Sequence, residues 1–127
     1  YKFTERIFNN QEIEVYGDGT SKRDYTYITD IVYGIIQSLD LKTEYKIINI
    51  GNSNPIELRK LISLIEENLN KKAKIIAREP IPGDMERTYA DIRTAKELLN
   101  YNPKVGIEEG IRLFCQWYVK NRASNNN

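Results

Sequence analysis

The chain has 127 residues and a mass of 14.9 kDa, which is enough for one domain or two small ones. Hydrophobic residues make up 40% and charged residues 29%, a composition typical of globular proteins rather than disordered or membrane-spanning ones. The 19 basic and 18 acidic residues leave a net charge of +1, so the basic excess of a typical nucleic-acid binder is missing.

The counts of histidine and cysteine limit the chemistry further. Histidine is absent, which excludes His-based acid–base catalysis, His-activated nucleophiles and His metal ligands. Cys115 is the single cysteine, so an intrachain disulfide and a cysteine cluster for zinc or iron–sulfur are excluded. We expect Cys115 to be a buried small hydrophobic side chain. No apolar run approaches the roughly 18 residues that predict a membrane-spanning helix.

The chain begins with Tyr1, and no signal-peptide pattern follows it. Two origins fit this start, a processing site or a position partway through a longer gene product, and we favour the second.

The first third of the chain predicts a helix end over residues 1–9, a strand over 12–16 and a loop over 17–21. Residues 23–28 are expected to be extended. Thr29 is predicted to cap a helix. The apolar stripe expected on that helix consists of Ile31, Val32, Ile35, Ile36 and Leu39.

The middle third contains Tyr45 to Ile50, where Ile47, Ile48 and Ile50 are nearly continuous, and this segment predicts a strand buried on both faces. A helix start follows, with Asn54 at the N-cap, Pro55 in the first turn and Glu57 three residues after the cap. We expect this helix to continue to about residue 70.

The last third predicts a strand over 74–78, a loop over 79–90 and a helix capped by Asp91. Residues 107–120 predict a final helix, and residues 123–127 a disordered tail. The side chains expected to face inward from the final helix are Ile107, Ile111, Phe114, Cys115 and Tyr118. This alternation of strands and helices predicts the α/β class, but three strands are too few for about five amphipathic helices.

One segment with binding potential runs from Val15 to Ile31 and contains Tyr16, a glycine-rich turn, and Arg23-Asp24-Tyr25 before a helix. A strand ending in an aromatic residue can face a planar base, and Arg23 can offer a bidentate fork to a diphosphate. From the spacing alone, a hairpin-like loop with a surface Arg–Asp pair explains the segment equally simply.

A second segment, Pro82-Gly83-Asp84 through Asp91 to Pro103, continues to Trp117-Tyr118. Together with the first segment and with Tyr45 to Ser53, it resembles the C-terminal part of the NAD-dependent epimerase/dehydratase family. This family comprises extended short-chain dehydrogenase/reductase proteins that act on nucleotide sugars. The similarity covers residues 1–122 and is best to UDP-glucuronate and UDP-glucose 4-epimerases.

The resemblance implies a role for individual residues. Tyr16 is expected at the uracil, Arg23 at the diphosphate with Tyr25 beside it, and Asp84 at a ribose hydroxyl. Some relatives carry a second phosphate-binding arginine at the position of Ile81. Arg87 or Arg78 could replace that arginine, although each could equally be a solvated charge.

The catalytic motifs of the family are not found in this sequence. Its NAD site needs a glycine-rich turn between the first strand and helix, and no Gly-x-x-Gly-x-x-Gly occurs here. Its catalytic base is a tyrosine with a lysine four residues later, and none of the nine tyrosines has one.

The resemblance therefore implies the substrate-binding C-terminal portion of an extended short-chain dehydrogenase/reductase fold, without the main Rossmann sheet. The expected function is to anchor a UDP-sugar in an NAD-dependent, cytoplasmic 4-epimerase, with the N-terminal Rossmann half as partner in a homodimer. No nucleic acid or membrane is expected as a partner. The alternatives are a 4,6-dehydratase or decarboxylase segment, a free-standing nucleotide-binding module, and a folded remnant without a ligand.

Overall fold

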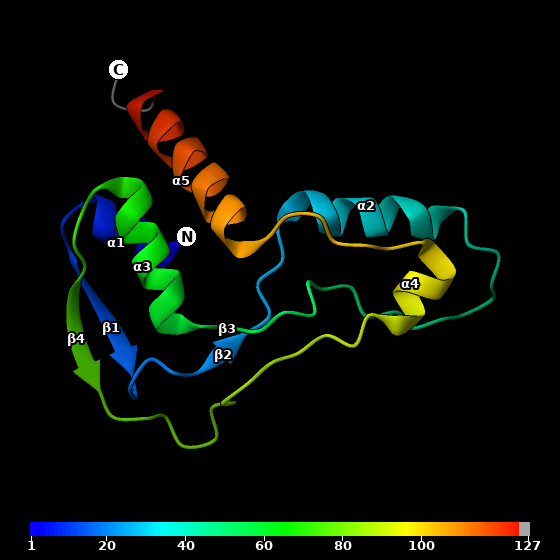
Figure 1. Ribbon diagram of the computed structural model, residues 1–127, viewed down its shortest axis with the longest axis horizontal. Helices are drawn as coiled ribbons and strands as arrows, with labels where there is room; N and C mark the ends of the chain where they lie inside the picture. The colour runs from blue at the N-terminus through cyan, green and yellow to red at the C-terminus, as the bar shows by residue number, and fades with distance from the viewer. Residues whose placement is uncertain (125–127) are drawn as a thin grey trace.

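The computed structural model describes residues 1–124 of the chain, and these residues form an α/β structure as predicted (Figure 1). The order of elements is α1 (Lys2–Phe8), β1 (Glu12–Tyr16), β2 (Lys22–Arg23), α2 (Ile28–Leu39), β3 (Ile56–Glu57), α3 (Leu58–Leu69), β4 (Lys74–Arg78), α4 (Arg93–Leu99) and α5 (Ile107–Ser124).

The longer sheet pairs β1 with β4 in parallel, from Glu12 opposite Lys74 to Tyr16 opposite Arg78. Both strands were predicted from the sequence at these bounds. Side chains alternate between the faces of a strand, so Ile13 and Val15 both point inward and are buried. The crossover between the strands carries α2 and α3, consistent with the long connection that a parallel pair requires.

Helix α1 packs against β1 and α3, and α5 packs against α3, so that the three helices and β1 enclose the larger core (Figure 1). The amphipathic helix α3 contributes two adjacent pairs of buried residues, Leu61-Ile62 and Leu64-Ile65, which repeat after three positions on its inner face. The predicted burial of Cys115 in α5 is confirmed, with 1% of the residue exposed. The buried members of this core are Ile7, Ile13, Val15, Leu61, Ile62, Leu64, Ile65, Ile107 and Cys115.

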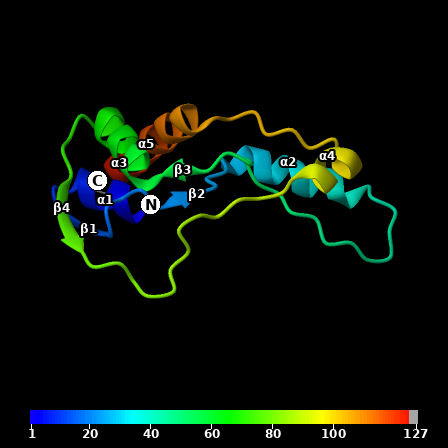
Figure 2. The ribbon, with the colours of Figure 1, turned by 60° about the horizontal axis from the view of Figure 1, so that its bottom comes forward.

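A second, smaller core lies at the other end of the elongated molecule, where α4 packs near α2 (Figure 2). Its buried members are Ile92, Ala95, Leu99 and Tyr101. The hydroxyl of Tyr101 donates a hydrogen bond to the carbonyl oxygen of Gly51 at 3.0 Å. This bond satisfies the polar group of a buried aromatic side chain and fixes the segment that precedes β3.

The short antiparallel pair of β2 and β3 joins the two ends of the molecule (Figure 1). Lys22 lies opposite Glu57, and Arg23 lies opposite Ile56. On its other edge, Lys22 forms an isolated bridge with Arg87. The segment that contains Arg23 is therefore held on both sides by backbone hydrogen bonds.

The predicted helix starts at Thr29 and Asn54 are wrong. Helix α2 begins at Ile28 with Tyr27 as its N-cap, so Thr29 lies inside the first turn. Helix α3 begins only at Leu58, because the two preceding residues are paired in β3. Pairing with a distant strand has overridden a strong local capping signal, which a single sequence window cannot reveal.

The predicted cap at Asp91 is displaced by one position, since Ile92 is the N-cap of α4. The Asp91 carboxylate nevertheless accepts a hydrogen bond from the backbone N–H of Arg93 at 3.1 Å. It therefore satisfies one of the free donors at the start of the helix.

The predicted strand from Tyr45 to Ile50 is wrong, because these residues lie outside every strand that the structure describes. No strand within residues 1–124 pairs with this run, and Tyr45 and Ile47 are exposed. The neighbouring stripe on α2 is also uncovered. Its exposed members include Val32, Ile35, Ile36 and Leu39.

Helix α5 continues to Ser124, beyond the predicted end at residue 120. Of the tail predicted for 123–127, residues 125–127 lie outside the described residues. No helix within residues 1–124 is long and apolar enough to cross a membrane.

Candidate functional site

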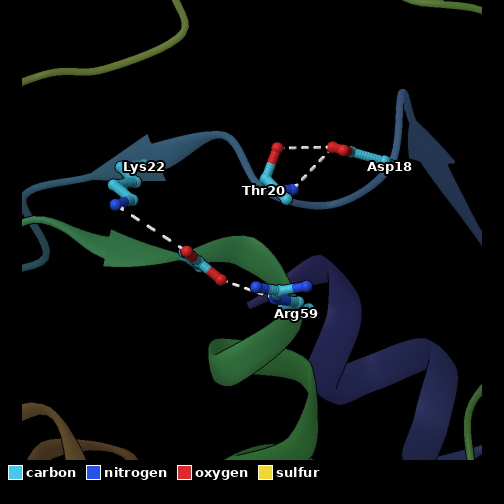
Figure 3. A network of polar contacts seen from close by, with 5 residues as sticks. Asp18, Thr20, Lys22 and Arg59 are labelled. Carbon is cyan, nitrogen blue, oxygen red and sulfur yellow. Dashed lines mark hydrogen bonds and ion pairs between the residues drawn. The ribbon is translucent and has the colours of Figure 1, made fainter.

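The glycine-rich turn after β1 forms one side of the candidate site. Gly17 and Gly19 have φ values of +71° and +77°, a region in which glycine is favoured because it has no Cβ. Between them, the Asp18 carboxylate accepts hydrogen bonds from the backbone N–H of Thr20 at 2.9 Å and from its hydroxyl at 2.5 Å (Figure 3). This local network fixes the path of the turn into β2.

A second network anchors β2 to the start of α3. Figure 3 shows Lys22 and Arg59 on either side of one carboxylate, which belongs to Glu57. Lys22 Nζ lies 3.7 Å from Glu57 Oε1, and Arg59 Nε donates to Glu57 Oε2 at 2.5 Å. The charges of these three exposed side chains are thus largely engaged with one another.

The loop after β4 forms the opposite side of the site. The Asp84 N–H donates to the carbonyl oxygen of Ile81 at 3.1 Å in a turn that places Gly83 at a φ of +84°. Further along, Lys22 N donates to Glu86 O at 2.8 Å, and Thr88 N donates to Lys22 O at 3.0 Å. These bonds hold the loop alongside β2.

The two sides enclose a cleft of about 960 Å³. Three residues predicted from the sequence, Tyr16, Asp84 and Arg87, line it. The other lining residues are Gly17, Asp18, Thr20, Ser21, Lys22, Glu57, Pro80, Ile81, Met85 and Glu86. The lining therefore combines an aromatic ring with charges of both signs.

Arg23 lies beside the cleft and is joined to it through Asp84. Its Nη2 donates to Asp84 Oδ1 at 3.0 Å, and its Nη1 donates to the carbonyl oxygen of Lys22 at 3.0 Å. The Arg23 side chain is 29% exposed and that of Asp84 is 54% exposed, so solvent and ligands can reach the pair. The surface pairs considered from the sequence, with Asp24 or Asp30, are not formed.

Arg87 and Arg78 have different surroundings. The Arg87 guanidinium lies 5.2 Å from the centre of the Tyr89 ring, and no carboxylate within residues 1–124 forms an ion pair with it. Arg78 instead pairs with Glu14 at 2.7 Å on the β1–β4 sheet. The hydrogen bond from Arg78 holds the pKa of Glu14 below its ordinary value. Arg87 therefore lines the cleft without a carboxylate partner in residues 1–124, whereas Arg78 is engaged by Glu14.

Tyr25 lies apart from the other predicted residues. It lines a different, mainly apolar cavity of about 710 Å³, together with residues of α1, α3 and α5 such as Phe3, Leu61 and Phe114. Burial raises the pKa of the Tyr25 hydroxyl above its ordinary value. The structure thus brings four of the five predicted residues together and leaves Tyr25 against the larger core.

The sequence reasoning missed the structural roles of two acidic residues, Asp24 beside Arg23 and Asp30 in α2. Asp24 accepts hydrogen bonds from three backbone N–H groups in two other loops. Asp30, which is 6% exposed, accepts bonds from Lys104 N and Val105 N, both at 3.0 Å. For Asp24, the available signal was its position directly after Arg23. For Asp30, it was its position inside an apolar helix, where a buried acidic residue needs a hydrogen-bond partner.

Within residues 1–124, no group of three His, Cys, Asp or Glu side chains is arranged to hold a metal ion. Nor do these residues form the glycine-rich strand-to-helix turn that holds a dinucleotide, since the glycine turn after β1 leads into β2. The groups that line the cleft can bind a ligand by contact with the Tyr16 ring, by hydrogen bonds and by ion pairs.

Comparison with known proteins identifies the family. The family model described as GDP-mannose 4,6 dehydratase matches residues 2–114. The chain belongs to the NAD-dependent epimerase/dehydratase family. The resemblance on which the sequence interpretation rested is therefore confirmed.

Relatives within the family include an uncharacterized protein of Methanocaldococcus jannaschii, which is 47% identical over 96% of this chain and 37% of its own. A UDP-glucuronate 4-epimerase of Thermodesulfobacterium geofontis is 40% identical over 95% of this chain and 38% of its own. A structure of the Bacillus cereus UDP-glucuronic acid 4-epimerase, in complex with UDP-glucuronic acid and NAD, matches with a TM-score of 0.84 and 29% identity. That match covers 93% of this chain and 38% of the epimerase. The chain thus spans less than two fifths of the length of these family members.

Proposed function

We propose that this chain is the UDP-sugar-anchoring C-terminal portion of an NAD-dependent nucleotide-sugar 4-epimerase. In the complete enzyme the sugar is oxidised at C4, the 4-keto sugar rotates, and hydride returns to its other face, chemistry that NAD supplies. The present residues bind and orient the substrate through its nucleotide. Binding energy from this remote part of the substrate positions the reacting carbon.

The observation that carries the proposal is the convergence on one cleft of Tyr16, Asp84 and Arg87, with Arg23 bonded to Asp84. These residues come from β1, β2 and the loop after β4, and Asp84 in that loop lies 61 residues after Arg23 in the sequence. The family resemblance points to the same four residues. The named epimerases among the relatives act on, or are bound to, a UDP-sugar of this type.

The geometry supports a division of roles among the four residues. A diphosphate that enters the cleft would compete with Asp84 for the guanidinium of Arg23, because both are anions. The released Asp84 carboxylate could then accept a hydrogen bond from a ribose hydroxyl. Tyr16, which is 42% exposed at the end of β1, offers its ring to the uracil. Arg87 supplies a cation without a competing carboxylate.

Exposed apolar surface supports the proposal that a Rossmann half is the partner of this segment. Leu39 at the end of α2 is 78% exposed, and Ile47 in the unpaired run is 74% exposed. An extended apolar run without strand partners can add to the edge of another sheet. The proposed homodimer of the complete enzyme is a separate expectation, to be tested by measuring its oligomeric state.

The proposal is tested by adding UDP to the isotopically labelled chain and following its backbone amide resonances. We expect concentration-dependent shifts in residues 16–22 and 84–88, and small shifts in α5. A response centred on the apolar cavity beside Tyr25, or no saturable response, would overturn the assignment of the cleft.

A further inference from the structure

Asp24 follows Arg23 directly and is an unusual acceptor of hydrogen bonds. Its Oδ2 accepts the backbone N–H groups of Ser53 and Ala90, both at 3.0 Å, and its Oδ1 accepts the N–H of Asn54 at 3.3 Å. The three donors belong to two loops that are separated by more than thirty residues. One carboxylate therefore connects β2 to both loops.

On one edge of β2, Asp24 continues the backbone ladder to the loop after β4. The ladder begins with Lys22 N donating to Glu86 O at 2.8 Å and with Thr88 N donating to Lys22 O at 3.0 Å. It continues with Asp24 N donating to Thr88 Oγ1 at 3.2 Å and Ala90 N donating to Asp24 Oδ2 at 3.0 Å. Side-chain oxygens thus replace backbone carbonyls in the last two bonds.

On the other edge, Asp24 extends the pairing with β3. The last backbone pair on this edge is Arg23 opposite Ile56. The residue before Ile56 is Pro55, which has no N–H to donate. The Asp24 carboxylate instead accepts the N–H of Ser53, two residues earlier. Both edges beyond Arg23 therefore depend on the same side chain.

The space around these bonds leaves little room for adjustment. A Cβ atom on Gly51 would lie 2.4 Å from Ala90 Cβ and 3.0 Å from Asp24 Oδ2. The two loops are therefore in close contact where the carboxylate joins them, and loss of its bonds would allow them to separate.

We propose that Asp24 is a positioning residue for the ligand-binding cleft, acting through Arg23 and the loop that carries Asp84. This inference rests on the proposed function, because it assigns Asp24 to the same UDP site. Asp24 holds the backbone on both sides of Arg23, so that the guanidinium stays at the cleft edge. Asp24 itself makes no contact with the ligand.

The test is a double-mutant cycle on UDP affinity, measured by calorimetry with Asp24→Asn, Arg23→Ala and the double variant. The amide of Asn would turn an N–H group toward backbone N–H donors, so at least one bond is lost. We expect Asp24→Asn alone to weaken UDP binding roughly tenfold, the scale of one lost charge-assisted interaction. In the Arg23→Ala background the same change should weaken binding less than about twofold, because residues that act through one another are not additive.

Asp30→Asn is the matched control. Asp30 is also a carboxylate held by backbone N–H groups, those of Lys104 and Val105, but it lies outside the cleft. We expect Asp30→Asn to lower the melting temperature and leave the UDP affinity within about twofold of the original chain.

Thr88→Val, which removes one bond of the ladder at an exposed position, is a milder variant should Asp24→Asn not fold. It should weaken UDP binding a few-fold.

The possible outcomes separate this inference from the proposed function. If the original chain does not bind UDP, the proposed function fails. If it binds UDP, but Asp24→Asn and Thr88→Val bind equally well, the positioning role alone is overturned. Equal losses from Asp24→Asn with and without Arg23 would also overturn it, since they would show that Asp24 does not act through Arg23.

Discussion

Arg23 is the residue expected to hold the diphosphate, and Asp84 keeps its guanidinium at the edge of the cleft. The bond to Asp84 engages one guanidinium nitrogen, and a second donates to the backbone of Lys22. Since the pair is accessible to solvent, we expect it to contribute at most about 1 kcal/mol to stability. A diphosphate could replace Asp84 at little cost.

The first prediction concerns substitution of Arg23. A charge-assisted contact with a phosphate is worth about 1.5–3 kcal/mol, so Arg23→Ala should weaken UDP binding roughly ten- to a hundredfold. Arg23→Lys should recover only part of this loss, because the planar fork is absent. Calorimetric titration measures both. Arg78→Ala, which removes a comparable exposed arginine outside the cleft, should leave the affinity unchanged. Equal affinities for the original chain and Arg23→Ala would contradict the phosphate role.

The second prediction concerns pH and the ion pair of Asp91 with Arg93. Hydrogen bonding from Arg93 lowers the pKa of Asp91 to about 2. Because the folded-state pKa lies below that of the unfolded chain, the stabilisation is present above about pH 4 and is lost as the pH falls toward 2. Asp91→Asn should therefore reduce the fall in melting temperature between about pH 4 and pH 2. The same fall in both proteins would show that this pair contributes nothing measurable.

Single residues could be assigned from the sequence only where the family resemblance supplied a role. Tyr16, Arg23, Asp84 and Arg87 were selected in this way, and they lie together. Asp24 was not selected, because its three partners are backbone N–H groups whose positions depend on the tertiary fold. Tyr25 was expected beside Arg23, but it lies two positions further along, beyond the end of β2, and packs against the larger core.

At the scale of elements, an apolar sequence pattern becomes a strand only where another strand is available to pair with it. Strands β1 and β4 have the predicted bounds, because each finds the other as a neighbour within the chain. The run from Tyr45 to Ile50 also has a strong apolar pattern, but no strand within residues 1–124 pairs with it. It therefore remains without strand structure. Helix α3 illustrates the same dependence, since pairing of β3 with β2 delays its start. A sequence pattern indicates which secondary structure a segment favours, whereas the hydrogen-bonding partners in the fold decide which one it adopts.

The third prediction concerns the contact between the loop before β3 and the loop before α4. A methyl group at Gly51 would lie 2.4 Å from Ala90 Cβ, and neither backbone can yield without moving a loop. We expect Gly51→Ala to destabilise the fold by about 1–3 kcal/mol, measured by denaturant unfolding. In Gly106→Ala the nearest atom would be 3.9 Å away, so its stability should change by less than about 0.5 kcal/mol. Equal stability of the two variants would show that the loops are not in close contact.

At the scale of the whole molecule, the exposed face of α2 indicates a surface that another structure covers. Ile35 and Leu39 lie four residues apart on this face and are 51% and 78% exposed. Contiguous apolar surface of this kind favours association.

The fourth prediction is that the purified chain self-associates through this face. The double substitution Ile35→Glu and Leu39→Lys places opposite charges one helical turn apart and should shift the protein toward the monomer in sedimentation velocity. Lys42→Glu, which changes charge at an exposed position just after α2, serves as a control and should not. An unchanged distribution in the double variant would exclude α2 as the contact.

The fifth prediction is that the purified chain does not interconvert UDP-glucose or UDP-glucuronate with the corresponding 4-epimers when NAD is supplied. The tyrosine–lysine pair and the glycine-rich cofactor turn of the family do not occur in these 127 residues. Chromatographic separation of the epimers provides the assay. Detectable turnover would overturn the assignment of the chemistry to another part of the enzyme.

The measurement that tests the central claim most directly is a comparison of UDP, UMP and uridine as ligands of the purified chain, by calorimetry at one ionic strength. A site that anchors a nucleoside diphosphate through Arg23 and Arg87 should bind UDP at least about tenfold more tightly than UMP, and UMP more tightly than uridine. Equal affinity for UDP and uridine, or no binding of any of the three, would contradict the claim that this cleft holds the diphosphate of a nucleotide sugar.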